Sequence, residues 1–312
     1  MDSFFNILLS ILPPFILLGI GGFARKLDWL RSEADTSLSM VTIRILYPCF
    51  ILFHILDTEL TLNKSTVVTP VFGFFSILAG FSIAWVVSKC IGIKEENTRT
   101  FLFCSGIFNY GFIAIPVALS LFDESIVVQI ILFNLGVEIA IWTFGILVLT
   151  SSRLSIRGLL NPPAITVVLG MLLQEAGGKG LLPDFLWEVI KALGMCCIPI
   201  GLILIGGNFY QLLKGFRFSS GYKIEISSVL VRNIIFPSLT IGYLIWGYFP
   251  ENMIWMKEIL VVQGAMPAGI FAVVIVSNYM QDKATAMQSI IVTMGFGVIS
   301  IPFWLFWGLK AL

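Results

Sequence analysis

Three polar side chains fall inside long apolar stretches of the chain. Asn134 and Glu138 are four residues apart, which places them on one face of a helix, and Arg232 lies well inside another apolar stretch. An ionised side chain at the centre of a membrane helix costs roughly 2.5–3.5 kcal/mol on insertion scales. Two interpretations of Glu138 remain open: it binds a coupling proton or cation, or it pairs with a buried partner such as Arg232. In the same way, Arg232 could hold the carboxylate of Glu138 or that of a substrate.

Two other apolar stretches are interrupted by glycine and proline. Proline lacks an N–H group and clashes with the carbonyl four residues back, and glycine loosens the same turn, so each helix should open near its middle. Freed backbone groups cannot stay unsatisfied in lipid, and the N-terminus of a half-helix suits an anion. The alternative is a kink that serves packing alone. The substrate-binding residues predicted on the two stretches are Asn109, Tyr110, Gly111, Pro116, Gln263, Gly264, Pro267 and Ala268.

The composition indicates the environment that positions these residues. Hydrophobic residues make up 58% of the chain, charged residues 12%, and the mean hydropathy is +0.97. A soluble domain is about half apolar and roughly a quarter charged, so the chain is predicted to be an all-α integral membrane protein. The net charge of +1 excludes a nucleic-acid partner, and a single histidine excludes a multi-histidine metal site. Motifs for nucleotide binding, zinc proteolysis or serine hydrolysis are lacking, so neither an enzyme nor a cofactor is expected.

Apolar runs between charged or turn-rich breaks predict ten transmembrane helices, because about 20 apolar residues cross the hydrocarbon core. The predicted spans are 4–24, 36–56, 66–91, 99–122, 125–150, 160–176, 184–206, 222–248, 254–280 and 284–309.

Most lysines and arginines fall in loops on one side of these ten spans, which should be the cytoplasmic side. A multi-pass protein of the cell membrane is therefore predicted, with both termini outside. No cleavable signal peptide is expected, since the first residues carry no basic group and no small-residue cleavage site follows.

Prolines recur half a chain apart. Pro13-Pro14 is matched by Pro162-Pro163, Pro48 by Pro199, and Pro116 by Pro267, each pair at the same rank of span. Because five spans per half is an odd number, the second half must enter the membrane from the opposite face, as in many secondary transporters. Two inverted five-helix repeats are thus predicted, residues 1–150 and 151–312, with chance recurrence of proline as the alternative.

Several short motifs occur along the chain: Leu46–Phe53, Asn109–Pro116, Asn161–Pro163, Ile198–Gly201, Gly206-Gly207 and Ala265–Pro267. With these motifs the chain resembles the auxin efflux carrier family of membrane transporters, whose prokaryotic members include candidate malonate transporters. The similarity runs over essentially the whole chain, and Ala114 and Ala268 depart from residues common in the family. Residues 151–160 alone separate the halves, so the long central loop of the plant auxin exporters is absent and auxin itself is not the expected substrate.

This resemblance implies that broken fourth and ninth helices cross near the bilayer midplane. It implies a scaffold of spans 1, 2, 6 and 7, through which a homodimer could form, and a moving transport unit of spans 3–5 and 8–10. The expected function is secondary active transport of a small organic anion by an elevator-type movement in the lipid bilayer, coupled to a proton or a sodium ion. A channel-like pore or a substrate-sensing receptor on the same fold is the alternative.

Overall fold

The computed structural model describes residues 4–57, 64–123, 125–150, 162–247, 249 and 253–312. Every regular element in these ranges is a helix. The elements are α1 (Phe4–Lys26), α2 (Glu33–Val41), η1 (Thr42–Leu46), α3 (Tyr47–Asp57), α4 (Lys64–Ile91), α5 (Glu95–Gly106), α6 (Ala114–Leu121), α7 (Ser125–Ala140), η2 (Ile141–Gly145), α8 (Ile146–Thr150), α9 (Pro162–Ala176), η4 (Gly178–Leu181), α10 (Asp184–Gly215), η5 (Ser220–Tyr222), α11 (Lys223–Val229), η6 (Leu230–Ile235), α12 (Phe236–Trp246), α13 (Ile254–Ala265), α14 (Phe271–Asn278) and α15 (Lys283–Lys310).

Seven helices in the described ranges are long and apolar enough to span a membrane, so the chain is a multi-pass membrane protein. The shorter apolar helix α9 occupies the predicted sixth span. The predicted fourth and ninth spans are each divided in two, as α5 with α6 and α13 with α14. The total of ten crossings therefore stays a prediction. The seven long helices are Phe4–Lys26, Glu33–Asp57, Val68–Ile91, Ser125–Thr150, Asp184–Gly215, Ser220–Trp246 and Lys283–Lys310.

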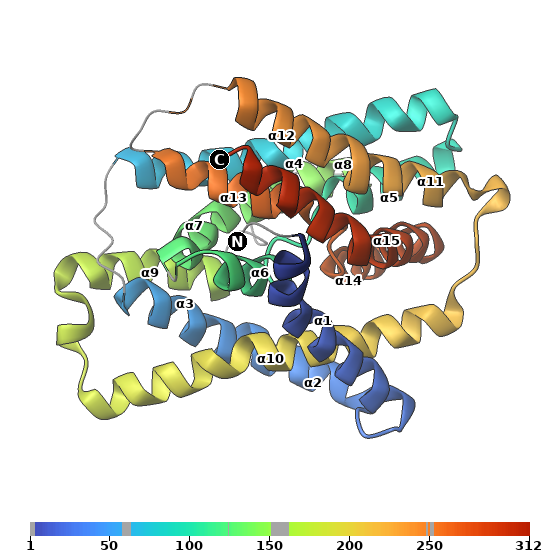
Figure 1. The fold of residues 1–312 in the computed structure, drawn as a ribbon. Coiled ribbons are helices and arrows are strands. Elements are labelled where there is room, and N and C mark those ends of the chain that lie inside the picture. Colours follow the sequence, from blue (N-terminus) through green and yellow to red (C-terminus); the bar gives the residue numbers. More distant parts are fainter. Residues whose placement is uncertain (1–3, 58–63, 124, 151–161, 248, 250–252) are drawn as a thin grey trace.

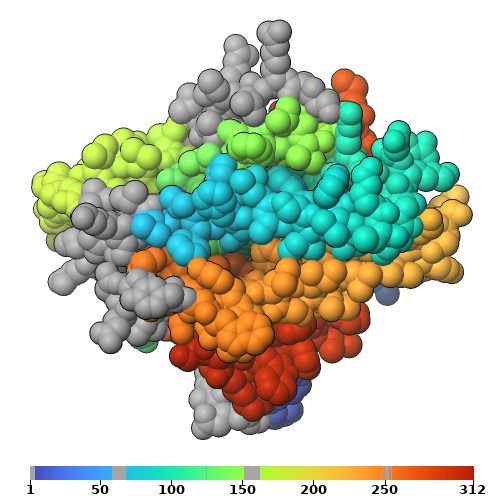
Figure 2. Space-filling view, turned by 90° about the horizontal axis from the view of Figure 1, so that it is seen from above, coloured from blue at the N-terminus to red at the C-terminus, as the bar shows by residue number. Residues whose placement is uncertain are grey.

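The helices form two layers (Figure 1). One layer contains α1, α2, α3, α9 and α10, and the other contains α4, α5, α7, α8 and α11 to α15. In the second layer α4 lies beside α11 and η6, and these segments form neighbouring bands on the face seen in Figure 2. The first layer holds the predicted spans 1, 2, 6 and 7, and the second holds the others.

Glycines bring the backbones of paired helices into contact. A Cβ atom on Gly21 of α1 would lie 2.0 Å from the carbonyl oxygen of Ile203 in α10, and one on Gly136 of α7 would lie 1.7 Å from that of Pro70 in α4. Small residues at such contacts are how membrane helices approach closely without a hydrophobic driving force between them. Each layer is thus organised around one tightly packed helix pair.

Three spans contain a π-helical turn: η1, η2 and η6. Turn η1 precedes Pro48, and turn η6 precedes Pro237. Each proline lacks an N–H group, which interrupts the normal hydrogen-bond ladder of the helix. A π turn inserts an extra residue, and such turns are frequent at functional sites. Trp142 lies in η2 and Arg232 in η6, so two side chains of the site described below project from these turns.

The paired prolines do not occupy equivalent positions in their helices. Pro116 lies in the first turn of α6, where a proline fits because its N–H would have no helical partner. Pro267 lies in the non-helical segment between α13 and α14. The predicted opening of the fourth span is present, but it begins after Gly106, and Pro116 lies just beyond it in the helix that follows. The inverted repeat inferred from proline spacing stays a prediction.

Candidate functional site

The two broken helices meet at their breaks. Residues 107–113 separate α5 from α6, and residues 266–270 separate α13 from α14. The two segments pair antiparallel: the N–H of Asn109 donates to the carbonyl of Pro267 at 2.8 Å, and the N–H of Gly269 donates to the carbonyl of Ile107 at 3.0 Å. These two segments are called the crossing below. Backbone groups released by one break are thus partly satisfied by the other, as an apolar environment requires.

Gly269 permits this pairing, although the sequence had not drawn attention to it. A Cβ atom at this position would lie 2.9 Å from the carbonyl oxygen of Phe108 on the opposite segment. Any larger residue would push the two segments apart. The neighbouring Ala268 donates its N–H to the hydroxyl of Thr293 on α15 at 3.3 Å, which ties the crossing to a third helix.

The carbonyl of Tyr110 accepts two amide groups from other helices. Asn134 of α7 donates to it at 3.0 Å and Gln263 of α13 at 3.2 Å, and Gln263 also lies 3.3 Å from the side-chain oxygen of Asn134. Both amide side chains are buried. Tyr110 and Gln263 were predicted to bind substrate and Asn134 to share a helix face with Glu138, and the structure brings the three together. A buried polar network of this kind fixes the position of the first crossing segment.

Glu138 is half-buried and accepts two hydrogen bonds from neutral donors. The hydroxyl of Tyr110 lies 2.5 Å from one carboxylate oxygen, and the indole N–H of Trp142 lies 2.8 Å from the other. Trp142 was missed from the sequence, although its position four residues after Glu138 on one helix face was a usable signal. A carboxylate with these partners keeps lone pairs for a proton or a cation.

Arg232 is fully buried, with 0% of its surface exposed. One terminal nitrogen donates to the carbonyl of Met266 at 3.1 Å, and the guanidinium lies 4.2 Å from the ring centre of Phe236 and 5.1 Å from that of Phe108. Its Nε and other terminal nitrogen have no hydrogen-bond partner among the described residues. The hydrogen bonds of Arg232 and those of Glu138 therefore go to different partners. Buried donors left unpaired cost about 1–3 kcal/mol each.

Asn109 lies at the entry to α6. Its side-chain oxygen accepts from the N–H of Ile113 at 3.4 Å, so the buried amide helps to satisfy the first turn of that half-helix. Ile113 is the residue directly before α6. Asn109 thus lies in the crossing, where its amide holds the backbone that leads into α6.

Gly264 and Gly111 have different surroundings. A Cβ atom on Gly264 would lie 2.8 Å from the methyl group of Thr240, so this glycine permits α13 to approach α12. A Cβ atom on Gly111 would meet only the hydroxyl of Tyr47, at 3.9 Å. Residues 110–112 are half-buried, whereas residues 266–270 are all buried. The first crossing segment is therefore the one with exposed surface.

The hydrogen-bond donors at the crossing suit an anion. They are backbone amides, neutral amide side chains, hydroxyls and one guanidinium. Within the described ranges, His, Cys, Asp and Glu residues form no group of three or more that could hold a metal. N–H groups and a buried cation recognise anions and polar carbonyl compounds instead.

Comparison with known proteins identifies the family of this chain. The family described as "Membrane transport protein", which is the auxin efflux carrier family, matches residues 6–156 and 148–305. A protein of Methanocaldococcus jannaschii named an uncharacterized transporter is 26% identical over 308 residues, covering 94% of this chain and 96% of its own. Another from Methanothermobacter thermautotrophicus, also named an uncharacterized transporter, is 21% identical over 301 residues, covering 95% and 96%. The chain therefore belongs to the membrane transport protein family, the family of the auxin efflux carriers.

Proposed function

We propose that the protein is a secondary active transporter that moves a small organic anion, a carboxylate, across the cell membrane. The observation that carries this proposal is the antiparallel pairing of two broken helices around buried polar groups. Discontinuous helices with half-helix ends at a common point are the usual substrate site of secondary transporters. The family membership supports transport in general, and the chemistry of the crossing supports the choice of an anion.

The positive character of the crossing has two sources. Helices α6 and α14 both begin directly after it, and helix N-termini carry partial positive charge and free N–H groups. Arg232 adds a full charge whose Nε and one terminal nitrogen lack partners among the described residues. A carboxylate bound nearby would lower the free energy of this buried charge. That gain would be absent for a neutral or cationic molecule, and it favours anions.

We assign the coupling role to Glu138. This carboxylate is half-buried, and the hydroxyl of Tyr110 connects it directly to the exposed segment of the crossing. A proton or a sodium ion on Glu138 would remove a negative charge from the neighbourhood of the incoming anion. Binding of the cation and binding of the anion would then favour one another.

The packing of the helices supports two inverted repeats, residues 1–150 and 151–312. In such a repeat, span 1 is equivalent to span 6, span 2 to span 7, and so on. The contact of α1 with α10 (spans 1 and 7) is then equivalent to the contact of α9 with α3 (spans 6 and 2). Likewise, the contact of α4 with α7 is equivalent to that of α11 with α15, and the contact of α5 with α15 to that of α13 with α7. The layer of α1, α2, α3, α9 and α10 would be the scaffold, and the other layer would move in an elevator-type cycle.

A counterflow experiment in proteoliposomes tests the proposal. Purified protein is screened with dicarboxylates and aromatic acids, and the expected result is that unlabelled anion inside accelerates entry of labelled anion. A channel-like pore would conduct without accelerated exchange, and a receptor would bind without flux, so either result would replace the carrier proposal.

We also propose that both termini face outside the cell, from the distribution of lysines and arginines in the loops. In a variant without the five native cysteines, single cysteines are placed at Ser220 and at Asn252. A membrane-impermeant thiol reagent applied to intact cells should label position 252 and spare position 220. The opposite pattern would reverse the orientation.

A further inference from the structure

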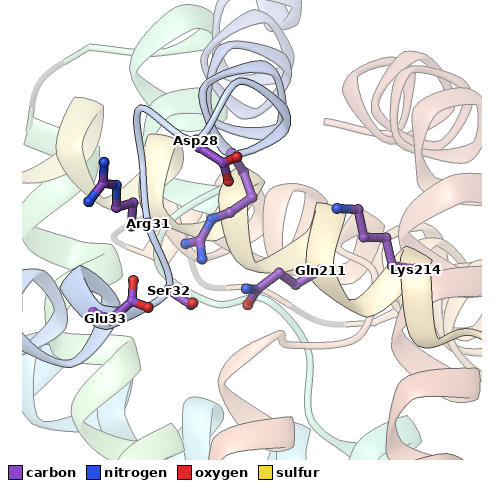
Figure 3. Close-up of a pocket in the computed structure, with 7 residues that line it drawn as sticks. Asp28, Arg31, Ser32, Glu33, Gln211 and Lys214 are labelled. Carbon is purple, nitrogen blue, oxygen red and sulfur yellow. The ribbon is translucent and has the colours of Figure 1, made fainter.

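A polar pocket lies at one end of the helix pair α1 and α10, away from the crossing (Figure 3). It has a volume of about 360 Å³ and opens where the end of α1, the turn to α2 and the last turns of α10 come together. Gln211 and Lys214 extend from α10 toward the turn that carries Asp28 and Ser32 (Figure 3). The lining residues are Arg25, Asp28, Arg31, Ser32, Glu33, Gln211 and Lys214.

Charges of both signs surround this pocket without neutralising one another. Arg31 and Lys214 are positive, Asp28 and Glu33 are negative, and none of the four forms a salt bridge in the described part of the chain. Opposite charges on one small surface normally pair when their geometry allows it. Arg31 and Lys214 lie on opposite sides of the pocket, with Asp28 between them in the view of Figure 3, so a ligand with both a cationic and an anionic group would find a partner for each.

The backbone around the pocket is held by a partly buried ion pair. Arg25 donates to both carboxylate oxygens of Asp35, which joins the end of α1 to α2. Its guanidinium rests on Gly207 of α10, where a Cβ atom would lie 3.2 Å from one of its nitrogens. Asp28 takes a left-handed conformation, with φ of 57°, that turns the chain sharply between the helices. The backbone around the pocket is therefore held by Arg25, while the other lining side chains are exposed.

Exposed aromatic residues place the pocket at the level of the lipid headgroups. Trp29, in the turn that lines the pocket, is 76% exposed and packs edge-on against the exposed ring of Phe23. Beyond Lys214, the exposed rings of Phe218 and Tyr222 also pack edge-on against each other. Tryptophan and tyrosine gather at the boundary between hydrocarbon and water. Both aromatic groups lie within a few residues of the pocket along the chain, at the ends of two membrane-spanning helices.

From these observations we propose that the pocket binds the headgroup of a zwitterionic phospholipid with a primary amine, of the phosphatidylethanolamine type. Lys214 contacts the phosphate from one side of the pocket, Arg31 adds positive charge from the other, and Asp28 and Glu33 accept hydrogen bonds from the ammonium group. A purely anionic headgroup would leave both carboxylates unpaired. A trimethylammonium headgroup has no N–H to donate. The acyl chains run along the apolar surface beside Phe23 and Trp29. This lipid site is independent of the proposed transport activity.

Native mass spectrometry of the purified protein tests the lipid site. Short-chain phosphatidylethanolamine, phosphatidylcholine and phosphatidylglycerol are added in turn, and the ethanolamine lipid should be retained best. The variants R31Q/K214Q and D28N/E33Q should each lower its retention about fivefold for every ion pair lost. The control K94Q/E96Q removes an exposed ion pair elsewhere and should retain lipid as the wild type does. The substituted side chains are exposed, and a melting curve of each variant checks folding.

Two results would overturn the proposal. Equal retention of the three lipids, or wild-type retention of the ethanolamine lipid by folded pocket variants, would mean that the pocket does not recognise this headgroup. Soluble glycerophosphoethanolamine supplies the same polar group without acyl chains. If it displaces the lipid completely at equal concentration, the ligand is a soluble phosphate ester and the lipid assignment is wrong. Weak or no competition supports the lipid.

Discussion

Replacing Arg232 with methionine is expected to raise the melting temperature of the ligand-free protein. It is also expected to abolish the further rise in melting temperature that a bound anion causes. The guanidinium is fully buried, and its Nε and one terminal nitrogen have no partner in the described part of the chain. Methionine has a similar length and no charge, so it can fill the space between the rings of Phe108 and Phe236. The substitution therefore removes a buried charge while largely keeping the packing.

The expected magnitude follows from the contacts of Arg232. The variant loses one charged hydrogen bond to Met266, about 1.5–3 kcal/mol, and two cation–π contacts of about 1–2 kcal/mol each. It gains relief from several kcal/mol of desolvation of a charge that has two unpaired nitrogens, and the carbonyl of Met266 loses its donor at a cost within the range given for that hydrogen bond. Replacing buried charges by apolar groups of similar volume often stabilises a protein by about 1–4 kcal/mol. A rise in melting temperature of roughly 2–8 °C is expected.

The assay is thermal unfolding of detergent-purified protein with and without the anion identified by counterflow. The wild type should melt higher with the anion, and Arg232→Met should melt higher without it and show no further rise. Arg44→Met is the matched control, since Arg44 also lies in a π-helical turn but is exposed, and it should change neither quantity.

A different outcome would refute the reasoning. Suppose that Arg232→Met melts several degrees below the wild type while Arg232→Lys retains wild-type stability. The buried positive charge would then stabilise the crossing without a bound anion. If Arg232→Met still responds to the anion and transports it, the substrate binds elsewhere.

Three further predictions concern the crossing and its neighbours. Glu138→Gln should abolish gradient-driven accumulation in proteoliposomes while leaving exchange, and a variant with full accumulation would exclude the coupling role. Gly264→Ala should lower the free energy of unfolding by about 1–3 kcal/mol because the new Cβ atom would clash with Thr240. Gly111→Ala should change it by less than about 0.5 kcal/mol, since its Cβ atom would meet only the hydroxyl of Tyr47, at an ordinary contact distance. Equal melting temperatures of the two variants would contradict this contrast. Pro267→Ala restores an N–H group and lets α13 extend into the break, so transport should fall without a loss of melting temperature, and wild-type flux would show that the break is only a packing kink.

The sequence was sufficient for the features that depend on short stretches of chain. An apolar composition in long runs indicates membrane helices whatever their arrangement, and the structure has helices at all ten predicted positions. The two interruptions were also visible, because glycine and proline act on the turn in which they occur. The family followed from the motifs around Asn109 and Pro267, and the family match confirmed it.

The tertiary structure alone decided which residues meet. Phe108 and Ala268 pair across the crossing although they lie far apart in the chain, and no local pattern records such a hydrogen bond. For the same reason the sequence could not tell whether Arg232 faces Glu138 or Met266. Pro116 was also paired with Pro267 because they are separated by the same number of residues as another proline pair. The effect of a proline depends on its position relative to the start of a helix, which the spacing does not give. Composition and periodicity act over a few turns of helix, and a binding site is assembled by contacts between distant segments that only the fold brings together.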